Sequence, residues 1–193
     1  MLSLEESLKI LKEAKALIEG HFILSSGLHS SKYVQCAQLM SRPHQALKIC
    51  SSLAEKIKNS VADFDLILSP AMGGIIVGYE LGKLLNKKTI FSERVNGEFE
   101  LRRGFKIKKG MKVLIVEDVI TTGKSSIECS KLVTLNKAII AGYACIIDRS
   151  NNKSAITNKI ISQVQLNIPT FKKNNLPDEL LSIEAIKPGS RNI

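Results

Sequence analysis

The chain has 193 residues and a formal net charge of +10. Its length suits one domain and is too short for two full-sized ones, while 44% hydrophobic and 24% charged residues exclude long disordered or collagen-like structure. The charge suggests a polyanionic partner: nucleic acid, an anionic membrane or a phosphate-rich ligand. A general bias toward lysine is the alternative, since 22 of the 28 basic residues are lysine.

Nothing in the sequence indicates secretion or membrane insertion. The N-terminus lacks a basic stretch followed by an apolar one, and no apolar run approaches the ~18 residues of a membrane span. The cysteines form no C-x-x-C pair, and we expect reduced core thiols and a cytoplasmic location. They are Cys36, Cys50, Cys129 and Cys145.

The N-terminal third combines helical and extended patterns. Residues 4–19 place apolar side chains on one helical face, and Ser3 with Glu6 forms a capping box before them. Residues 21–37 are expected to be extended and loop-like, with a turn at 25–27. A second helix is predicted over 43–58, with a proline in its first turn.

From residue 65 onward, short apolar strands alternate with helices. The predicted strands are 65–69, 88–92, 112–117 and 138–147, and the predicted helices are 74–85 and 123–135. Residues 93–111 have a hairpin-like pattern. The tail has weaker signals for a strand at 163–168, a short helix near 178–183 and a loop at 188–189.

This alternation predicts an α/β fold with a central parallel sheet covered by helices on both faces. In such sheets a ligand binds beyond the carboxyl ends of the strands. The candidate segments are therefore those that follow Leu68, Ser92, Val116 and Ile147.

The strongest signal for a ligand site lies after the strand at 112–117. The strand runs into two acids, Glu117 and Asp118, and then into a turn that opens a helix. A helix N-terminus offers unpaired N–H groups to a phosphate, and Gly123 lets the backbone approach it closely. The two carboxylates suit ribose hydroxyls or a hydrated divalent cation. Further hydrogen bonds could come from the hydroxyls of Thr121, Thr122, Ser125 and Ser126.

Two alternatives to this interpretation can be weighed. Residues 123–125 resemble the end of a Walker A loop, but that motif needs a glycine where Asp118 stands, so an NTPase P-loop is excluded. The other alternative is an ordinary capped helix after a core strand. It would leave two acids at the end of a buried strand without partners, which is costly.

Two further segments suit a pyrophosphate. The loop of Ala71, Met72, Gly73 and Gly74 has little side-chain bulk, so its backbone N–H groups could meet the anion. A tight strand-to-helix turn is the alternative there. Residues 83–112 hold ten basic and three acidic residues, and cations directed at a leaving pyrophosphate stabilise the transition state. A solvated, lysine-rich hairpin is the alternative for most of these lysines.

In combination, these motifs resemble the type I phosphoribosyltransferases, and among them the orotate phosphoribosyltransferases of a bacterial short-loop subgroup. The resemblance covers nearly the whole chain. The segments that carry it are Gly20-His21-Phe22, residues 25–27, Tyr33-Val34, residues 69–75, Glu93-Arg94, residues 101–105, residues 117–125, Asp148-Arg149-Ser150 and residues 187–191.

The resemblance implies transfer of a phosphoribosyl group from 5-phosphoribosyl 1-pyrophosphate to orotate. The products would be orotidine 5′-monophosphate and pyrophosphate, in de novo pyrimidine (UMP) biosynthesis, with Mg²⁺ carried mainly by the donor and not by direct protein ligands. It also implies one type I phosphoribosyltransferase domain over 1–193, with a small hood built from 1–40 and part of 150–193. A homodimer with shared active sites, without nucleic acid or membrane as partner, is expected.

By the same resemblance, each part of the site has a function. The donor would be bound by Glu117, Asp118, Val119, Ile120, Thr121, Thr122, Gly123, Lys124 and Ser125, and its pyrophosphate by the loop of residues 71–74. Catalytic roles would fall to Asp118, Arg94, Arg102 and Arg103. Orotate would contact Thr121, Arg149, Tyr33 and Val34, and a guanidinium can bind a carboxylate with two parallel hydrogen bonds.

The chain departs from better-known members of the family at several positions. Met72-Gly73 stands where many have Tyr-Lys, and Val95 follows Arg94 where many have Lys, so the replacement for the family's loop lysine is left open. Two other functions are alternatives. A purine acceptor would not need Arg149, and a non-catalytic regulator that binds nucleic acid would need a binding motif that the sequence lacks.

Overall fold

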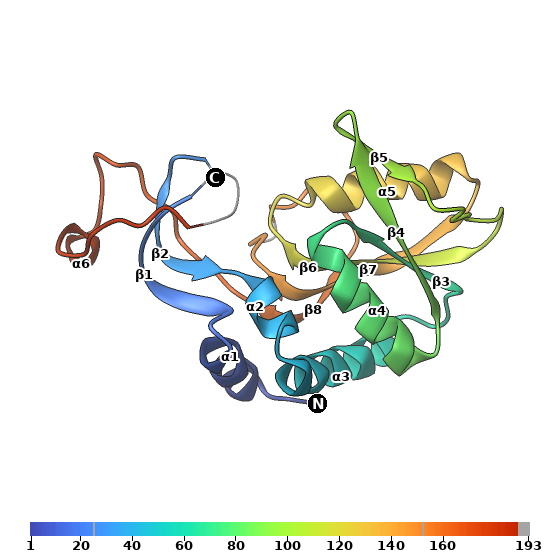
Figure 1. Ribbon diagram of the computed structural model, residues 1–193, viewed down its shortest axis with the longest axis horizontal. Coiled ribbons are helices and arrows are strands. Elements are labelled where there is room, and N and C mark those ends of the chain that lie inside the picture. The colour runs from blue at the N-terminus through green and yellow to red at the C-terminus, as the bar shows by residue number, and fades with distance from the viewer. Residues whose placement is uncertain (25, 152, 189–193) are drawn as a thin grey trace.

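The computed structural model describes residues 1–24, 26–151 and 153–188 (Figure 1). Ser25 of the predicted turn and residues 189–191 of the tail motif lie outside these ranges. The chain forms a larger part, built on a six-stranded sheet, and a smaller part, built on a two-stranded sheet, which lies to the left in Figure 1.

The larger sheet has the strand order β5-β4-β3-β6-β7-β8. Its strands are β3 (Leu66–Pro70), β4 (Lys88–Val95), β5 (Glu98–Leu101), β6 (Lys112–Ile120), β7 (Ile139–Asp148) and β8 (Ile160–Gln165). The predicted α/β fold is confirmed. The sheet is parallel except for β5, which pairs antiparallel with β4 within the segment that the sequence predicts to be hairpin-like. The connecting residues Asn96 and Gly97 both have positive φ, as a tight hairpin turn requires.

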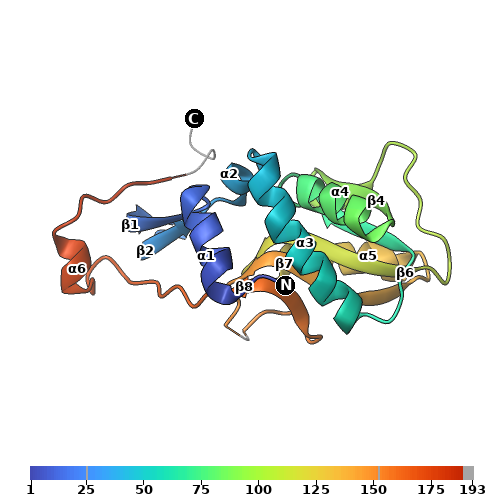
Figure 2. The ribbon, with the colours of Figure 1, turned by 90° about the horizontal axis from the view of Figure 1, so that it is seen from below.

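Helices cover both faces of this sheet (Figures 1 and 2). α3 (Pro43–Ser60) and α4 (Gly73–Leu85) pack on one face, and α5 (Lys124–Leu135) packs on the other. Because side chains alternate along a strand, Ile67 joins the core beneath α3 and α4 while Leu66 joins the core beneath α5. The strands thus contribute to two cores, as an α/β fold demands.

The first helix is shorter than its apolar pattern predicts. α1 spans Leu4–Glu13 and begins with the predicted capping box of Ser3 and Glu6. Lys15 adopts a φ of 56°, and Ala16 N–H bonds back to Leu11 O at 2.8 Å, which closes the helix with a left-handed cap. The predicted helix over 4–19 is therefore wrong beyond Glu13.

The chain continues into the smaller sheet, in which β1 (Leu17–Ile23) pairs antiparallel with β2 (His29–Val34). The C-terminal segment, which includes α6 (Asp178–Leu181), joins this sheet at two places. Ile23 N–H donates to Ile186 O at 2.8 Å, and the backbones of His29 and Phe171 exchange two hydrogen bonds of 2.8 Å. The unit thus combines segments from the two ends that the sequence assigns to the hood.

Other differences from the predicted elements are small. A short helix, α2 (Cys36–Met40), precedes α3 and was not predicted. β8 begins three residues before the predicted strand, because it pairs with β7 from Ile160 onward. All four cysteines are buried and free. None of the helices in the described ranges is long and apolar enough to cross a membrane.

Candidate active site

The end of β6 brings the predicted site segments together. The Asp118 carboxylate lies against Gly73 of the pyrophosphate loop, since a Cβ built on that glycine would be 2.6 Å from Oδ2. On the other side, Arg149 N–H donates to Ile120 O at 2.8 Å. Ala71 N–H donates to Ser92 O at 2.8 Å, which joins the loop to β4. The segments after β3 and β7 therefore meet the end of β6 at one edge of the sheet, with β4 beside them.

Glu117 is a buried carboxylate with one side-chain partner. It is 8% exposed, and its Oε1 accepts a hydrogen bond from the Ser126 hydroxyl. Burial raises the pKa of Glu117 from 4.5 to about 7, and the Asp118 carboxylate adds to the rise. The prediction that Ser126 donates to a phosphate is wrong, because this residue is fully buried and its hydroxyl is used by Glu117.

Asp118 is half-buried beside the pyrophosphate loop. Burial raises the pKa of its carboxyl, while backbone N–H groups lower it. The thiol of Cys36 lies 3.8 Å from the Asp118 carbonyl oxygen, so α2 supports the backbone at this residue. Met72 in the loop is 84% exposed, and the peptide bond between Ala71 and Met72 is cis.

The turn into α5 forms an open cradle. Gly123 adopts a φ of 75° as the N-cap of the helix, a conformation that favours glycine. Thr121, Thr122 and Lys124 are exposed and Ser125 is half-exposed. The side chains of Val119 and Ile120 pack into the two cores, so only their backbones could meet a ligand. The side-chain hydroxyls, the lysine ammonium and the backbone N–H groups of the first helical turn remain as hydrogen-bond donors to an anion.

Arg149 directly follows β7. Its Nε atom is buried and has no hydrogen-bond partner. Burial lowers the pKa of Arg149, and nearby Tyr33 acts in the opposite sense. The Tyr33 ring lies 5.7 Å from that of Phe22, while Val34 packs against the core. Because a buried donor without an acceptor is costly, this arrangement favours a ligand with acceptor oxygens beside Arg149, and an anion would also match its charge.

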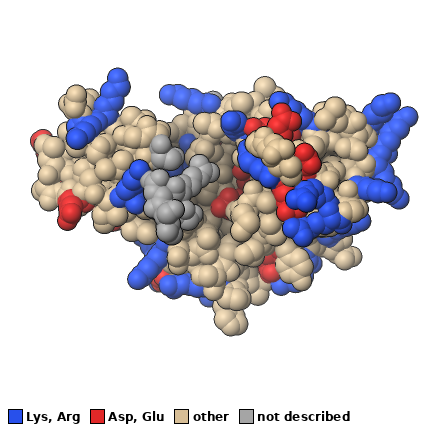
Figure 3. All heavy atoms as spheres, turned by 45° about the horizontal axis from the view of Figure 1, so that its top comes forward, with Lys and Arg blue, Asp and Glu red and all other residues tan. Residues whose placement is uncertain are grey.

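Of the three predicted loop arginines, Arg94 lies on β4, and Arg102 and Arg103 lie in the turn after β5. Arg103 donates two 2.9 Å hydrogen bonds to Glu93, and Arg94 pairs with Glu128 of α5. Arg102 is exposed. In Figure 3 a group of acidic side chains lies among basic ones on the right-hand half of the molecule, which holds the sheet. The charge of this region is thus partly paired within the chain. Nothing in the sequence pattern signalled Glu128 as a member of the site.

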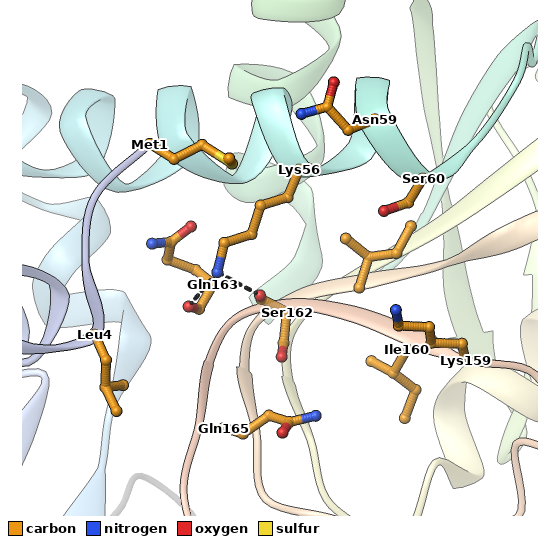
Figure 4. A pocket seen from close by; sticks show the side chains of 11 residues that line it. Met1, Leu4, Lys56, Asn59, Ser60, Lys159, Ile160, Ser162, Gln163 and Gln165 are labelled. Atoms are coloured by element: carbon orange, nitrogen blue, oxygen red, sulfur yellow. Dashed lines mark hydrogen bonds between the residues drawn. The ribbon is translucent and has the colours of Figure 1, made fainter.

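A separate hollow of about 610 Å³ lies between the first residues, α3 and β8 (Figure 4). Lys56 projects into it and donates to the carbonyl oxygens of Ser162 and Gln163 at 3.2 and 2.9 Å. Its lining contains no predicted site residue. In the described part of the chain, no cluster of three or more His, Cys, Asp or Glu side chains could hold a metal ion.

Comparison with known proteins agrees with this geometry. Residues 40–177 match the phosphoribosyl transferase domain family. An orotate phosphoribosyltransferase of Parvibaculum lavamentivorans is 46% identical over 98% of both chains. Among solved structures, an orotate phosphoribosyltransferase of Aeropyrum pernix matches with a TM-score of 0.71 at 23% identity, over 82% of this chain and 92% of that one. An adenine phosphoribosyltransferase of Thermoanaerobacter pseudethanolicus matches with a TM-score of 0.62 at 19% identity, over 70% of this chain and 88% of that one.

The chain therefore belongs to the phosphoribosyltransferase family, whose fold it shares with members that use different bases. The low-identity structures define the fold alone and leave the base open. The full-length relative places the chain more narrowly, among the orotate phosphoribosyltransferases.

Replacing the buried acid Glu117 by Gln is expected to stabilise the protein at high pH. Since burial raises its pKa from 4.5 to about 7, the native state keeps a proton that the unfolded state releases, and stability falls as pH rises through this range. The neutral amide avoids this penalty, which is at most about 3 kcal/mol. Thermal unfolding at about pH 5 and about pH 8.5 should show a gain only at the higher value. An equal gain in stability at both pH values would show that the pKa of Glu117 is not raised by burial.

The Gly73→Ala substitution is expected to displace the Asp118 carboxylate, because the new methyl group would lie 2.6 Å from it. We expect kcat/KM to fall about tenfold to a hundredfold. Gly142→Ala is a matched control, since its Cβ would meet neighbours at 3.6 Å, an ordinary contact. Steady-state kinetics of both variants test the prediction, and similar kinetics for the two would show that Asp118 does not need this space.

Proposed function

We propose that this protein transfers the phosphoribosyl group of 5-phosphoribosyl 1-pyrophosphate to orotate, in UMP biosynthesis. Orotate N1 attacks C1 of the donor, the bond from C1 to pyrophosphate breaks, and orotidine 5′-monophosphate forms. Positive charge develops on the ribose in an oxocarbenium-like transition state. Among residues 1–24, 26–151 and 153–188, no serine or cysteine lies in a recognisable nucleophile setting, so we expect no covalent intermediate.

The observation that carries the choice of base is the buried Arg149 Nε without a partner. Orotate is a pyrimidine with a carboxylate, and a guanidinium binds a carboxylate with two charge-assisted hydrogen bonds. Adenine and hypoxanthine carry no carboxylate and would offer the guanidinium no charged partner. The phenol of Tyr33 lies close to Arg149, so its apolar ring and polar hydroxyl could both contact a base bound there.

The donor would extend from the pyrophosphate loop to the cradle. In this arrangement Glu117 and Asp118 hold the ribose hydroxyls, and residues 121–125 hold the 5′-phosphate. Two hard carboxylate oxygens are also ligands that Mg²⁺ accepts, so the same pair could contact a cation that arrives with the donor. When bound, Mg²⁺ neutralises charge on the departing pyrophosphate.

A homodimer is part of the proposal, and its support is an apolar stripe at the start of α4. Met72, Ile76 and Tyr79 are 84%, 55% and 67% exposed, and their spacing places them on one helical face. The stripe begins in the pyrophosphate loop, so a second copy covering it would adjoin the site. Exposed apolar residues gathered in this way are typical of protein interfaces.

Arg149→Ala is expected to remove the preference for orotate over uracil, which lacks the carboxylate. Loss of a buried charge-assisted pair should lower kcat/KM for orotate about a hundredfold and change that for uracil much less. Measuring pyrophosphate release with each base gives the ratio of kcat/KM for orotate to kcat/KM for uracil.

Asp118→Asn is the companion variant. This substitution should lower the rate with both bases, since Asp118 is proposed to bind the donor and not the base. Unaltered rates with orotate in both variants would show that the site is assigned wrongly.

Tyr79→Glu is expected to give monomers at concentrations where the wild type is dimeric, because it places a charge within the apolar stripe. Leu135→Glu is a matched control, since Leu135 is 77% exposed at the end of α5, on the opposite face of the sheet. Sedimentation velocity distinguishes the two forms. Persistence of dimers in the Tyr79 variant would contradict an interface at α4.

A further inference from the structure

The residue before Arg149 is a buried aspartate to which the proposed reaction assigns no role. Asp148 is the last residue of β7 and is 6% exposed. Its backbone is held on both sides, since it lies opposite Ile120 of β6 and its carbonyl oxygen accepts Leu166 N–H at 2.8 Å. A carboxylate buried at such a place needs hydrogen bonds, because burial without them is costly.

The Asp148 carboxylate closes a turn around Arg149. Its Oδ1 accepts the backbone N–H of Ser150 at 2.8 Å, in a bond that is itself buried. Aspartate often bonds in this way to the backbone two residues ahead, and the turn that results has one residue at its centre. That residue is Arg149, whose own N–H donates to Ile120 O at 2.8 Å. Because the residues before and after it are held, the direction of the Arg149 Cα–Cβ bond is fixed.

This direction matters because the arginine side chain is long and flexible. Ordering it costs rotamer entropy, and a contact through two parallel hydrogen bonds requires the guanidinium in one plane. Residues 149–159 connect β7 to β8, and the described ones belong to no helix or strand. Regular structure therefore holds Arg149 only from the side of β7, and the bond from Ser150 to Asp148 supplies the restraint on the other side.

We propose that Asp148 is a positioning residue for base recognition, which directs the Arg149 guanidinium at the carboxylate of the acceptor by closing the turn through Ser150 N–H. The inference rests on the proposed function for the identity of the acceptor. Asp148 acts through geometry and not through its charge, since the turn requires only an acceptor oxygen in the place of Oδ1.

The ratio of kcat/KM for orotate to kcat/KM for uracil measures this effect, because uracil has no carboxylate for Arg149 to bind. Asp148→Ala should lower the ratio about tenfold, which is less than the loss in Arg149→Ala, because the guanidinium is misdirected and not removed. The change should appear mainly in the KM for orotate, since Arg149 contacts the base before the transition state as well as in it. Unfolded protein would lower kcat with both bases alike and leave the ratio unchanged.

Two further variants separate geometry from charge. Asp148→Asn removes the charge but keeps an oxygen for Ser150 N–H, so its ratio should stay within about threefold of the wild-type value. Asp148→Glu keeps the charge, but its carboxylate lies one methylene farther out and cannot close the same turn, so its ratio should fall as in Asp148→Ala. Asp148→Glu takes the place of Asp148→Ala if that variant does not fold.

A control and a double variant complete the test. Asp65→Ala removes a carboxylate that accepts Lys112 N–H at 2.8 Å where β6 begins, at the opposite edge of the sheet, and it should keep the wild-type ratio. In an Arg149→Ala background, Asp148→Ala should change the ratio by less than about twofold, because no guanidinium remains to be directed.

A wild-type ratio in Asp148→Ala would overturn the inference, and so would a ratio lost in Asp148→Asn but kept in Asp148→Glu, or a full further fall in the Arg149→Ala background. If the wild type does not prefer orotate, or Arg149→Ala keeps that preference, the proposed choice of base fails and this inference fails with it. If Arg149→Ala loses the preference and Asp148→Ala keeps it, only this inference fails.

Discussion

The candidate site depends on one constraint, which is that β6 is a central strand and ends in two acids. Its neighbours β3 and β7 bury the strand as far as Glu117, so the carboxylates emerge only at the edge of the sheet. The other site segments are fixed to this end. Gly73 lies against Asp118, Arg149 N–H donates to Ile120 O at 2.8 Å, and Ala155 N–H donates to Thr122 O at 2.9 Å. The position of β6 thus sets the position of the whole site.

Charge is distributed unevenly around this point. Glu117 is buried and Arg149 is partly buried, and burial raises the pKa of the acid and lowers that of the guanidinium. Arg94 and Arg103 lie farther out and already have carboxylate partners. The inner groups are suited to a bound ligand that satisfies them, and the outer ones to an exchange of partners as an anion arrives.

Local patterns predicted most of the fold. Continuous apolar runs identified β3, β6 and β7, and the turn with Gly123 identified the cradle, because these features depend on neighbouring residues. The long helix over 4–19 was wrong, since a left-handed Lys15 has no signal of the kind that Gly or Asn supplies. Contacts between distant segments could not be predicted, such as Glu128 with Arg94 or Ser126 with Glu117. Both require knowing how α5 lies on the sheet.

The central claim is that Arg149, whose Nε atom is buried without a hydrogen-bond partner, selects a carboxylated pyrimidine as acceptor. It is tested most directly by incubating the purified wild-type protein with Mg²⁺ and 5-phosphoribosyl 1-pyrophosphate, offering orotate, uracil, hypoxanthine or adenine in parallel, and following each base by absorbance. The account predicts rapid consumption of orotate and little or none of the other three bases. Consumption of a purine in preference to orotate, or no consumption of orotate, would contradict it.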